Sequence, residues 1–352
     1  MKYLYLLFFS VTVSGFIMAQ EVRPVRDEVG FCWTKGETDE LINYLSSKDD
    51  NKKEETAEGL IGGISPHDDF LFAGGVYYPL FKLLKAKEVI IFGVTHGTVR
   101  KEIGDPKNQL LLDDYKFWKG PYGNVEVAGL REVIKSNLKP EYISVNDKAH
   151  TLEHSIEALV PFLQHFNPGV KITPIMVTQM PYETMDKISS ELSGIIADYI
   201  KKNNLTVGKD IAFLVSSDAT HYGKDFNFAP YGEDEQAHKT ATERDLFVAK
   251  TNLNKTLDLE AVNALNSELT REQDPKYQSP TWCGKFSVPF GLLTTVKTLE
   301  KLGLKASGKV LGYSDTWTEG VMPIKRTNMG ITAPFSLKHW CGHLSAGIYL
   351  NQ

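Results

Sequence analysis

One stretch of the chain brings a carboxylate, an imidazole and several hydroxyls together at short spacing. Residues 215–223 read Val-Ser-Ser-Asp-Ala-Thr-His-Tyr-Gly and follow an apolar, β-prone run at residues 211–214. This pattern is typical of a buried strand that reaches its carboxyl end and breaks into a loop. Ligands of open α/β sheets lie beyond such ends. Asp218 and His221 are therefore candidate catalytic residues, close enough to act as an oriented base pair or to support metal ligands.

Two further apolar runs end in a histidine. Residues 60–66 lead into His67, and residues 88–95 lead into His96. The whole chain has only 9 histidines, so three strand ends that each carry one exceed what composition alone would give. Their joint placement favours one shared site, although either histidine alone would more often be an ordinary loop residue. The remaining histidines lack this context, apart from His154, and are interpreted as surface or structural residues: His150, His165, His238, His339 and His343.

The three cysteines cannot all pair within one chain. Cys283 lies just before a long apolar helical run and has two readings. It is either a small buried hydrophobe, as free cysteines usually are, or a thiolate at a helix N-terminus that is available to a metal. If two cysteines pair in an oxidising compartment, we expect Cys32 and Cys341 to do so and to leave Cys283 free.

Strands alternate with helices along the chain. Residues 171–178 predict a strand, and apolar residues at helical spacing predict helices over residues 184–202 and 288–302. A helix is also expected to begin after Gly74 and Gly75, and Thr151 is expected to open another. Residues 110–123 read as a long loop over the sheet edge. These elements predict one α/β domain, residues 20–352, with a central mostly parallel or mixed sheet flanked by helices.

Composition narrows the class of protein. The chain has 352 residues, is 42% hydrophobic and 24% charged, and carries a net charge of -5. These values fit a globular protein with a large core. No basic cluster is present to neutralise phosphates, so nucleic acid is not expected as a partner.

The first residues have the form of an export signal. Lys2 supplies the positive end, residues 3–18 are nearly all apolar, and Ala19 is a small residue suited to cleavage. The alternative is a membrane anchor. The apolar run is short for an anchor, and no basic stop-transfer cluster follows it. We therefore expect residues 1–19 to be a cleaved signal peptide and Gln20 to begin the mature chain. The mature protein would then be periplasmic or secreted, without stable membrane insertion.

A set of motifs together resembles the Memo family, also called AmmeMemoRadiSam system protein B. In chain order they are Trp33, Pro66-His67, Thr95-His96, Glu153-His154-Ser155-Ile156-Glu157, Ser216-Ser217-Asp218-Ala219-Thr220-His221-Tyr222-Gly223 and Cys283-Gly284. The resemblance covers essentially everything after residue 19. It implies a fold related to the class III extradiol dioxygenases. It also implies a cleft metal site formed by His67, His96 and Cys283, with Asp218 and His221 beside it.

The chain departs from the family pattern near the first histidine. Asp68 and Asp69 follow His67 where the family usually has alanine and glycine, and Phe72 stands where it usually has a tyrosine. Gly97 replaces a second histidine. The two added carboxylates are expected to alter metal preference or substrate. Further residues expected in the cleft or behind the ligands are Trp33, Glu153 and His154.

The expected ligands narrow the choice of metal. Two neutral imidazoles and a thiolate suit iron, copper or zinc better than magnesium or calcium. Three protein ligands leave an open position for water, dioxygen or substrate, as catalytic sites do. Iron or copper is favoured here, with zinc possible.

Three functions are compatible with these residues. The first is a metal-dependent oxidoreductase, dioxygenase-like or cycling electrons on iron or copper. The second is a metallohydrolase in which His221 or Asp218 acts as base toward a zinc-activated water. The third is a non-catalytic protein that uses the same cleft to bind a small molecule, a peptide or a metal. Fold alone does not decide among them.

Overall fold

A ten-stranded mixed sheet forms the centre of the molecule. The computed structural model describes residues 21–49, 58–271, 279–324 and 327–351. Within them the strand order is β11-β12-β13-β2-β9-β3-β8-β4-β7, and β10 pairs with β13. The strands are β2 (Leu60–Ser65), β3 (Glu88–Val94), β4 (Leu110–Leu112), β7 (Ile143–Val145), β8 (Lys171–Val177), β9 (Ile211–Ser216), β10 (His221–Gly223), β11 (Thr256–Leu257), β12 (Ala306–Asp315) and β13 (His339–Leu350). This architecture confirms the expected single α/β domain.

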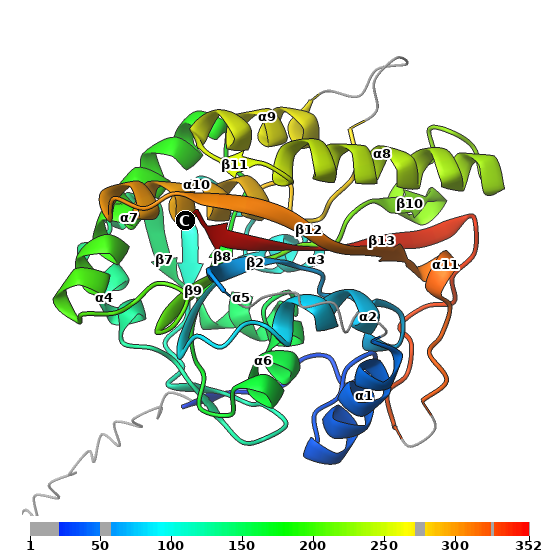
Figure 1. The fold of residues 1–352 in the computed structure, drawn as a ribbon, viewed down its shortest axis with the longest axis horizontal. Coiled ribbons are helices and arrows are strands. Elements are labelled where there is room, and N and C mark those ends of the chain that lie inside the picture. The colour runs from blue at the N-terminus through cyan, green and yellow to red at the C-terminus, as the bar shows by residue number, and fades with distance from the viewer. Residues whose placement is uncertain (1–20, 50–57, 272–278, 325–326, 352) are drawn as a thin grey trace, which may run out of the picture.

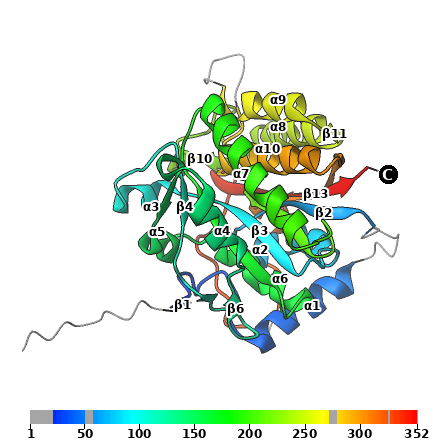
Figure 2. The same ribbon diagram turned by 90° about the vertical axis from the view of Figure 1, so that its left-hand side faces the viewer.

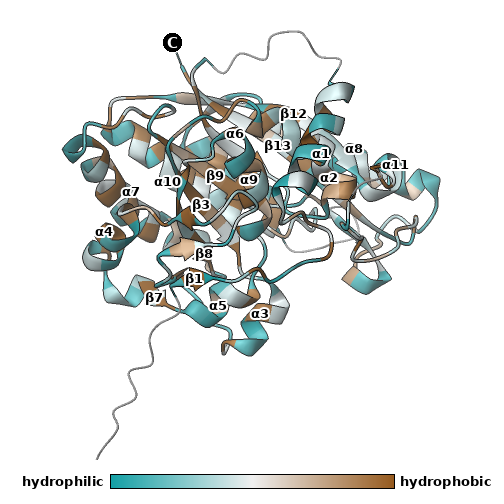
Figure 3. Ribbon diagram, turned by 90° about the horizontal axis from the view of Figure 1, so that it is seen from below, coloured by the Kyte–Doolittle hydropathy of each residue, from teal (hydrophilic) through white to brown (hydrophobic). Residues whose placement is uncertain are grey.

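The neighbouring strands β2, β9, β3 and β8 run parallel, whereas β13 joins β2 antiparallel. Every residue of β2 and β9 is buried. Burial on both faces is typical of parallel strands that are covered by helices on each side, and it explains their almost continuous apolar sequences. Figure 3 shows hydrophobic colour along β3, β8 and β9, while much of the outer helices is hydrophilic.

Helices cover both faces of the sheet (Figure 1). One layer contains α4 (Leu130–Asn137), α7 (Tyr182–Lys202), α8 (Glu235–Leu253), α9 (Leu259–Thr270) and α10 (Ser287–Lys301), and its apolar side chains form one large buried cluster with the sheet. The other contains α1 (Lys35–Lys48), α2 (Phe70–Phe81) and α6 (Val160–Phe166), which form a second buried cluster. Figure 2 shows α4 beside α7. The short helices α3 (Gly97–Glu102), α5 (Asp147–Leu152) and α11 (Thr316–Glu319) lie in the connections.

The segment expected as a loop over residues 110–123 contains two strands. β4 extends the main sheet, and β5 (Phe117–Trp118) pairs with β1 (Val22–Arg23) and β6 (Val125–Glu126) in a small second sheet. Buried Arg23 holds β1 in place, because its guanidinium forms an ion pair with Glu157 and donates to the carbonyl of Glu153 at 2.7 Å. A strand of two or three residues is too short to show alternating hydrophobicity in the sequence. Whether such a segment forms a strand depends on the partner strand that it pairs with.

Two helix boundaries differ from expectation. α2 begins at Phe70, before the paired glycines, and ends two residues after Pro79. Gly74 lies inside this helix, and a β-carbon there would come within 2.9 Å of the flexible terminal methyl of Met322. Thr151 lies near the end of α5 rather than opening a helix, since the chain turns at Glu153 and next becomes regular at residue 157.

The expected signal peptide, residues 1–19, lies outside the described residues. Among the described helices, none combines the length and apolar character needed to span a membrane. All three cysteines lie in described parts of the chain and are free, so the conditional pairing of Cys32 with Cys341 does not occur in this structure.

Candidate metal centre

Three adjacent strands deliver His67, His96 and Asp218 to one edge of the sheet. β2 and β3 flank β9, and all three run parallel, so their carboxyl ends meet. The alignment continues past the strands, because Ser217 N donates to the Ser65 carbonyl at 2.9 Å and His67 N donates to Asp218 Oδ1 at 2.9 Å. The sheet therefore fixes the positions of these residues without the help of a bound metal.

Cys283 reaches the same edge from the loop that precedes α10. A β-bridge between Thr220 and Trp282 ties this loop to the segment after β9. Asp218 N donates to Cys283 Sγ at 3.1 Å. A β-carbon on Gly284 would lie 2.3 Å from Ser217 Oγ, so a glycine is required for the loop to come this close.

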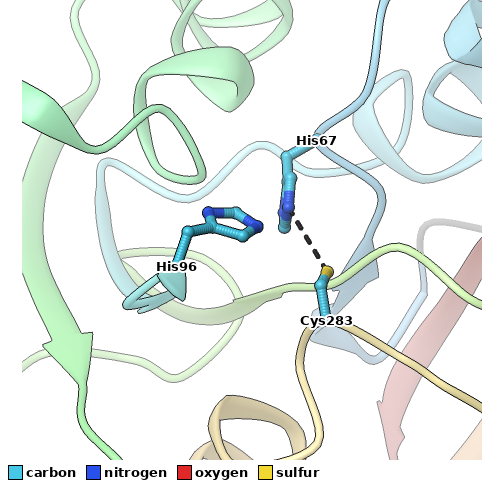
Figure 4. Close-up of side chains that lie close together, drawn as sticks. All are labelled: His67, His96 and Cys283. Atoms are coloured by element: carbon cyan, nitrogen blue, oxygen red, sulfur yellow. Dashed lines mark hydrogen bonds between the residues drawn. The ribbon is translucent and has the colours of Figure 1, made fainter. Parts of the chain in front are cut away.

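The three proposed ligands converge. One ligand atom from each of His67, His96 and Cys283 lies within 4.8 Å of the others. His67 Nε2 is 3.4 Å from Cys283 Sγ, and Figure 4 shows a ring nitrogen of His96 directed toward His67. A nitrogen and a sulfur bound tetrahedrally to one ion at ~2.1 and ~2.3 Å lie about 3.6 Å apart. The observed separation therefore fits two donors of a shared ion.

The hydrogen bonds behind His67 select the tautomer that binds a metal. Ser216 Oγ donates its only proton to the Ser155 carbonyl at 2.5 Å, so it must accept from His67 Nδ1, which lies 2.7 Å away. Nδ1 then carries the proton and leaves a lone pair on Nε2. Burial lowers the pKa of His67 to about 3, which keeps the ring neutral. Neutral imidazole with a fixed back-side hydrogen bond is the usual form of a histidine metal ligand.

Glu153 plays the corresponding part behind His96. Its Oε1 lies 2.8 Å from His96 Nδ1, and its Oε2 accepts from His96 N at 2.9 Å. Burial opposes ionisation of Glu153, but His96 and His154 outweigh burial and lower its pKa. The carboxylate therefore accepts the Nδ1 proton and leaves the other nitrogen of His96 to face the site. The Glu153 carboxylate also accepts from His154 N and Ser155 N, which makes it the centre of the turn after α5.

The charge balance of the site fits a cation. Burial, and then the nearby Asp218, raise the pKa of Cys283 well above its ordinary value, so the sulfur is a thiol that can donate to His67 Nε2. Asp218 Oδ2 lies 3.2 Å from the same nitrogen. A neutral Nε2 has no proton for this oxygen, so two electron-rich atoms face each other. A cation would displace the thiol proton and relieve this contact.

Asp218 and His221 form a second set of donors around the same sulfur. One ligand atom from each of Asp218, His221 and Cys283 lies within 4.8 Å of the others. His221 Nε2 is 3.8 Å from Asp218 Oδ2, beyond hydrogen-bond distance. Within the described part of the chain this buried nitrogen has no hydrogen-bond partner. It is thus available to a water, a substrate or a metal.

Sequence comparison identifies the family. The model for Memo-like proteins matches residues 30–321.

The chain belongs to the Memo-like family.

A MEMO1 family protein of Pyrococcus horikoshii is 26% identical over 269 residues, which cover 73% of this chain and 82% of the relative. A MEMO1 family protein of Methanosarcina barkeri is 30% identical over 165 residues, 46% of this chain and 55% of the relative. One from Sulfurisphaera tokodaii is 33% identical over 167 residues, 45% of this chain and 52% of the relative. The chain thus spans about half the length of several Memo-like relatives that it matches.

The residues in which this chain departs from the family pattern lie behind or beside the ligands. Asp68 Oδ2 is 2.9 Å from Nε2 of fully buried His343. Asp69 accepts from the backbone N of Thr332 at 2.6 Å. Phe72 packs edge-to-face against Phe335, with ring centroids 4.7 Å apart. Both added carboxylates therefore have partners within the protein, which favours a structural role for them over direct metal binding.

His154 is held as a cation near the two histidine ligands. Its Nδ1 lies 2.7 Å from Asp27 Oδ2, and its ring centroid is 5.0 Å from that of His96. Burial lowers the pKa of His154, but the Asp27 hydrogen bond and the charge of Glu153 outweigh burial and raise it to about 9. One ligand atom of His154 lies within 4.8 Å of ligand atoms of His96 and Glu153, but a metal that bound it would have to displace the proton of this imidazolium. Trp33 supports this wall, since its Nε1 donates to the Asp27 carbonyl at 2.6 Å.

Sequence reasoning missed four residues that shape the site: Asp27, Ser155, Ser216 and His343. Ser155 and Ser216 stood inside the motifs already recognised, so their position beside the candidate ligands was the available signal. His343 was interpreted as surface or structural, and its position in the run of small and apolar residues that forms β13 pointed to burial. Asp27 carried no local signal, because its contact with His154 joins residues 127 positions apart.

Proposed function

We propose that this Memo-like protein is an exported, metal-dependent oxidoreductase that binds iron or copper through His67, His96 and Cys283. The observation that carries the proposal is the convergence of the three donors together with the hydrogen bonds that fix both imidazoles from behind. Two imidazoles and one thiolate favour iron, copper or zinc over hard cations. The open side faces Asp218 and His221, which gives the site a catalytic rather than a structural form.

A redox-active metal held at this position would supply electron transfer to dioxygen or to a bound substrate. The protein's own contribution is positioning and proton transfer. The unpartnered His221 Nε2 can take a proton from a substrate hydroxyl or return one to it. Asp218 stays ionised, because the surrounding histidines outweigh the opposing effect of burial and lower its pKa. It can therefore stabilise the imidazolium that forms on His221.

Export is part of the proposal and rests on residues 1–19 of the sequence. The compartment would be periplasmic or extracellular, and the ligand a small molecule or a peptide reaching the cleft. The net charge of -5 supports a partner other than nucleic acid.

The test is a metal analysis of the exported protein purified without added metal, followed by titration with Fe(II), Cu(I) and Zn(II). We expect iron or copper near one ion per chain, and loss of that metal in Cys283→Ser and His67→Gln. His165→Gln is a matched control, because His165 lies on α6 and bonds Tyr122 instead.

Each other outcome redirects or ends the proposal. Zinc as the native metal would favour the metallohydrolase, with His221 as base. A folded protein that binds none of the three metals would favour a non-catalytic binding protein. If the Cys283 and His67 variants retained metal as tightly as the parent, these residues would not be metal ligands.

A further inference from the structure

A cavity of about 420 Å³ adjoins the candidate metal centre, and the charged residues that the structure describes in its lining are all cationic. His96 and Cys283 contribute to its wall, as do Arg100, Arg271 and Lys285. Among the described residues that line it, none is an aspartate or a glutamate. The protein as a whole is acidic, with 44 carboxylates against 39 lysines and arginines, so this local balance is opposite to that of the chain.

Arg100 is held beside the site by the helix that follows His96. Its backbone N donates to the His96 carbonyl at 2.9 Å, which places it one turn into α3. Its nearest carboxylate oxygen, Asp105 Oδ1, is 3.6 Å from Nη1, beyond a direct hydrogen bond. Its Nε is buried and has no hydrogen-bond partner in the described structure. Arg100 lines the cavity, and a guanidinium whose donors are not all satisfied within the protein is suited to an anionic oxygen.

Lys285 lines the same cavity from the turn before α10, two residues after Cys283. Its Nζ lies 5.4 Å from the ring centroid of Phe286, and it forms no ion pair with a carboxylate among the described residues. Arg100 and Lys285 therefore come from separate elements, each next to a proposed metal ligand. Two cations that line one cavity from different elements concentrate an anion more strongly than one flexible surface charge.

Half of the remaining lining residues are apolar: Val94, Val177, Leu269, Pro280, Trp282 and Phe286. Small polar side chains come from Thr95, Gln179, Thr270, Thr281 and Ser287. A volume of about 420 Å³ lies within the usual range of small-molecule pockets, roughly 300–1,000 Å³. The ligand that fits this lining has an apolar body and one anionic group.

We propose that this cavity binds a small organic anion, an apolar body bearing a carboxylate or phosphate group, with that group held by Arg100 and Lys285. The apolar body would then lie against Trp282 and Phe286, next to His96 and Cys283. That such an anion is the substrate of the metal centre rests on the proposed function. That the cavity binds such an anion can be tested without metal.

The experiment measures binding of three probes to the full exported chain by calorimetry and ligand-detected NMR. Benzoate and phenyl phosphate carry the anionic group, and benzamide is the neutral counterpart. We expect both anions to bind chelator-treated protein about tenfold or more tightly than benzamide, and to lose most of that preference as salt rises. The tighter of the two anions decides between carboxylate and phosphate.

Matched variants separate the cavity from general surface charge. Arg100→Gln and Lys285→Gln should each weaken benzoate binding about tenfold and leave benzamide unchanged. Arg100→Lys should restore part of the affinity. Lys101→Gln removes the same charge from the same helix at an exposed position outside the cavity and should have no effect.

Two results would overturn the inference: equal binding of benzoate and benzamide, or equal losses in Lys101→Gln and Arg100→Gln. Metal titration of the same samples distinguishes this failure from that of the proposed function. Metal binding without anion preference would defeat the cavity inference alone. Anion preference in a protein that binds no metal would defeat the proposed oxidoreductase alone.

Discussion

The two walls of the site hold neighbouring histidines in different protonation states, with His67 neutral and His154 a cation. The ring centroids of His67 and His154 lie only 5.5 Å apart. On the sheet side, complete burial lowers the pKa of His67 to about 3, and the group behind its Nδ1 is a neutral hydroxyl. On the N-terminal side, the Asp27 carboxylate behind His154 outweighs burial and raises its pKa to about 9. The pKa values of these two rings are therefore shifted in opposite directions, and the neutral ring of His67 keeps the lone pair that a metal ligand needs.

The largest expected difference is in metal affinity. Replacing His67 by Gln removes a ligand and should weaken Fe(II) or Cu(I) binding by about 100-fold or more, beyond the ~10–100-fold typical of a residue behind a ligand. His154→Gln should change it less than about threefold, since a protonated imidazole contributes no bond. Competition with a colorimetric chelator measures both, with folding checked by circular dichroism. Equal losses of metal affinity in the two variants would show that His67 and His154 do not differ as metal ligands.

The second prediction concerns the hydroxyl behind His67. Ser216→Ala leaves the ring in place but removes the acceptor for Nδ1, so metal affinity should fall about 10–100-fold. Ser136→Ala is the control, because the exposed Ser136 hydroxyl bonds only the Glu132 carbonyl on the surface of α4. An unchanged affinity in Ser216→Ala would show that the tautomer is not set by this contact.

The third prediction is a smaller effect on stability. The folded-state pKa of His154, about 9, lies above its ordinary value of 6.5. Its contribution to stability is therefore complete below pH 6.5 and is lost as pH rises through 9. Asp27→Asn should lower the pKa of His154 and flatten this part of the pH profile. Urea unfolding of parent and variant from pH 6 to 10, with NMR titration of the His154 ring, measures both. Parallel profiles would contradict the assignment.

The sequence predicted the parts of the site that depend on regular structure. His67, His96 and Asp218 follow apolar runs, and parallel strand ends meet wherever the sheet forms. The helix expected to open at Thr151 was wrong, because the chain turns at Glu153, whose carboxylate accepts from His96 N, His154 N and Ser155 N just after α5 ends. A side chain that draws in distant backbone groups leaves no periodic signal in its own segment.

The contacts of Asp27 and Arg23 in the N-terminal wall were beyond prediction for a related reason. Asp27 and Arg23 act through contacts with residues more than 120 positions away, and only the folded chain brings them together. Local patterns report what a segment prefers by itself, whereas these contacts depend on how the small second sheet is placed against α5.

We propose that two imidazoles and the Cys283 sulfur share one ion, and the X-ray absorption spectrum of the metal-loaded protein at the iron or copper edge tests this most directly. We expect a sulfur shell of one atom at about 2.3 Å and nitrogen scatterers near 2.0–2.1 Å with imidazole character. The sulfur shell should vanish in Cys283→Ser and persist in His154→Gln. A spectrum of the parent with only nitrogen and oxygen neighbours would show that Cys283 does not bind the metal.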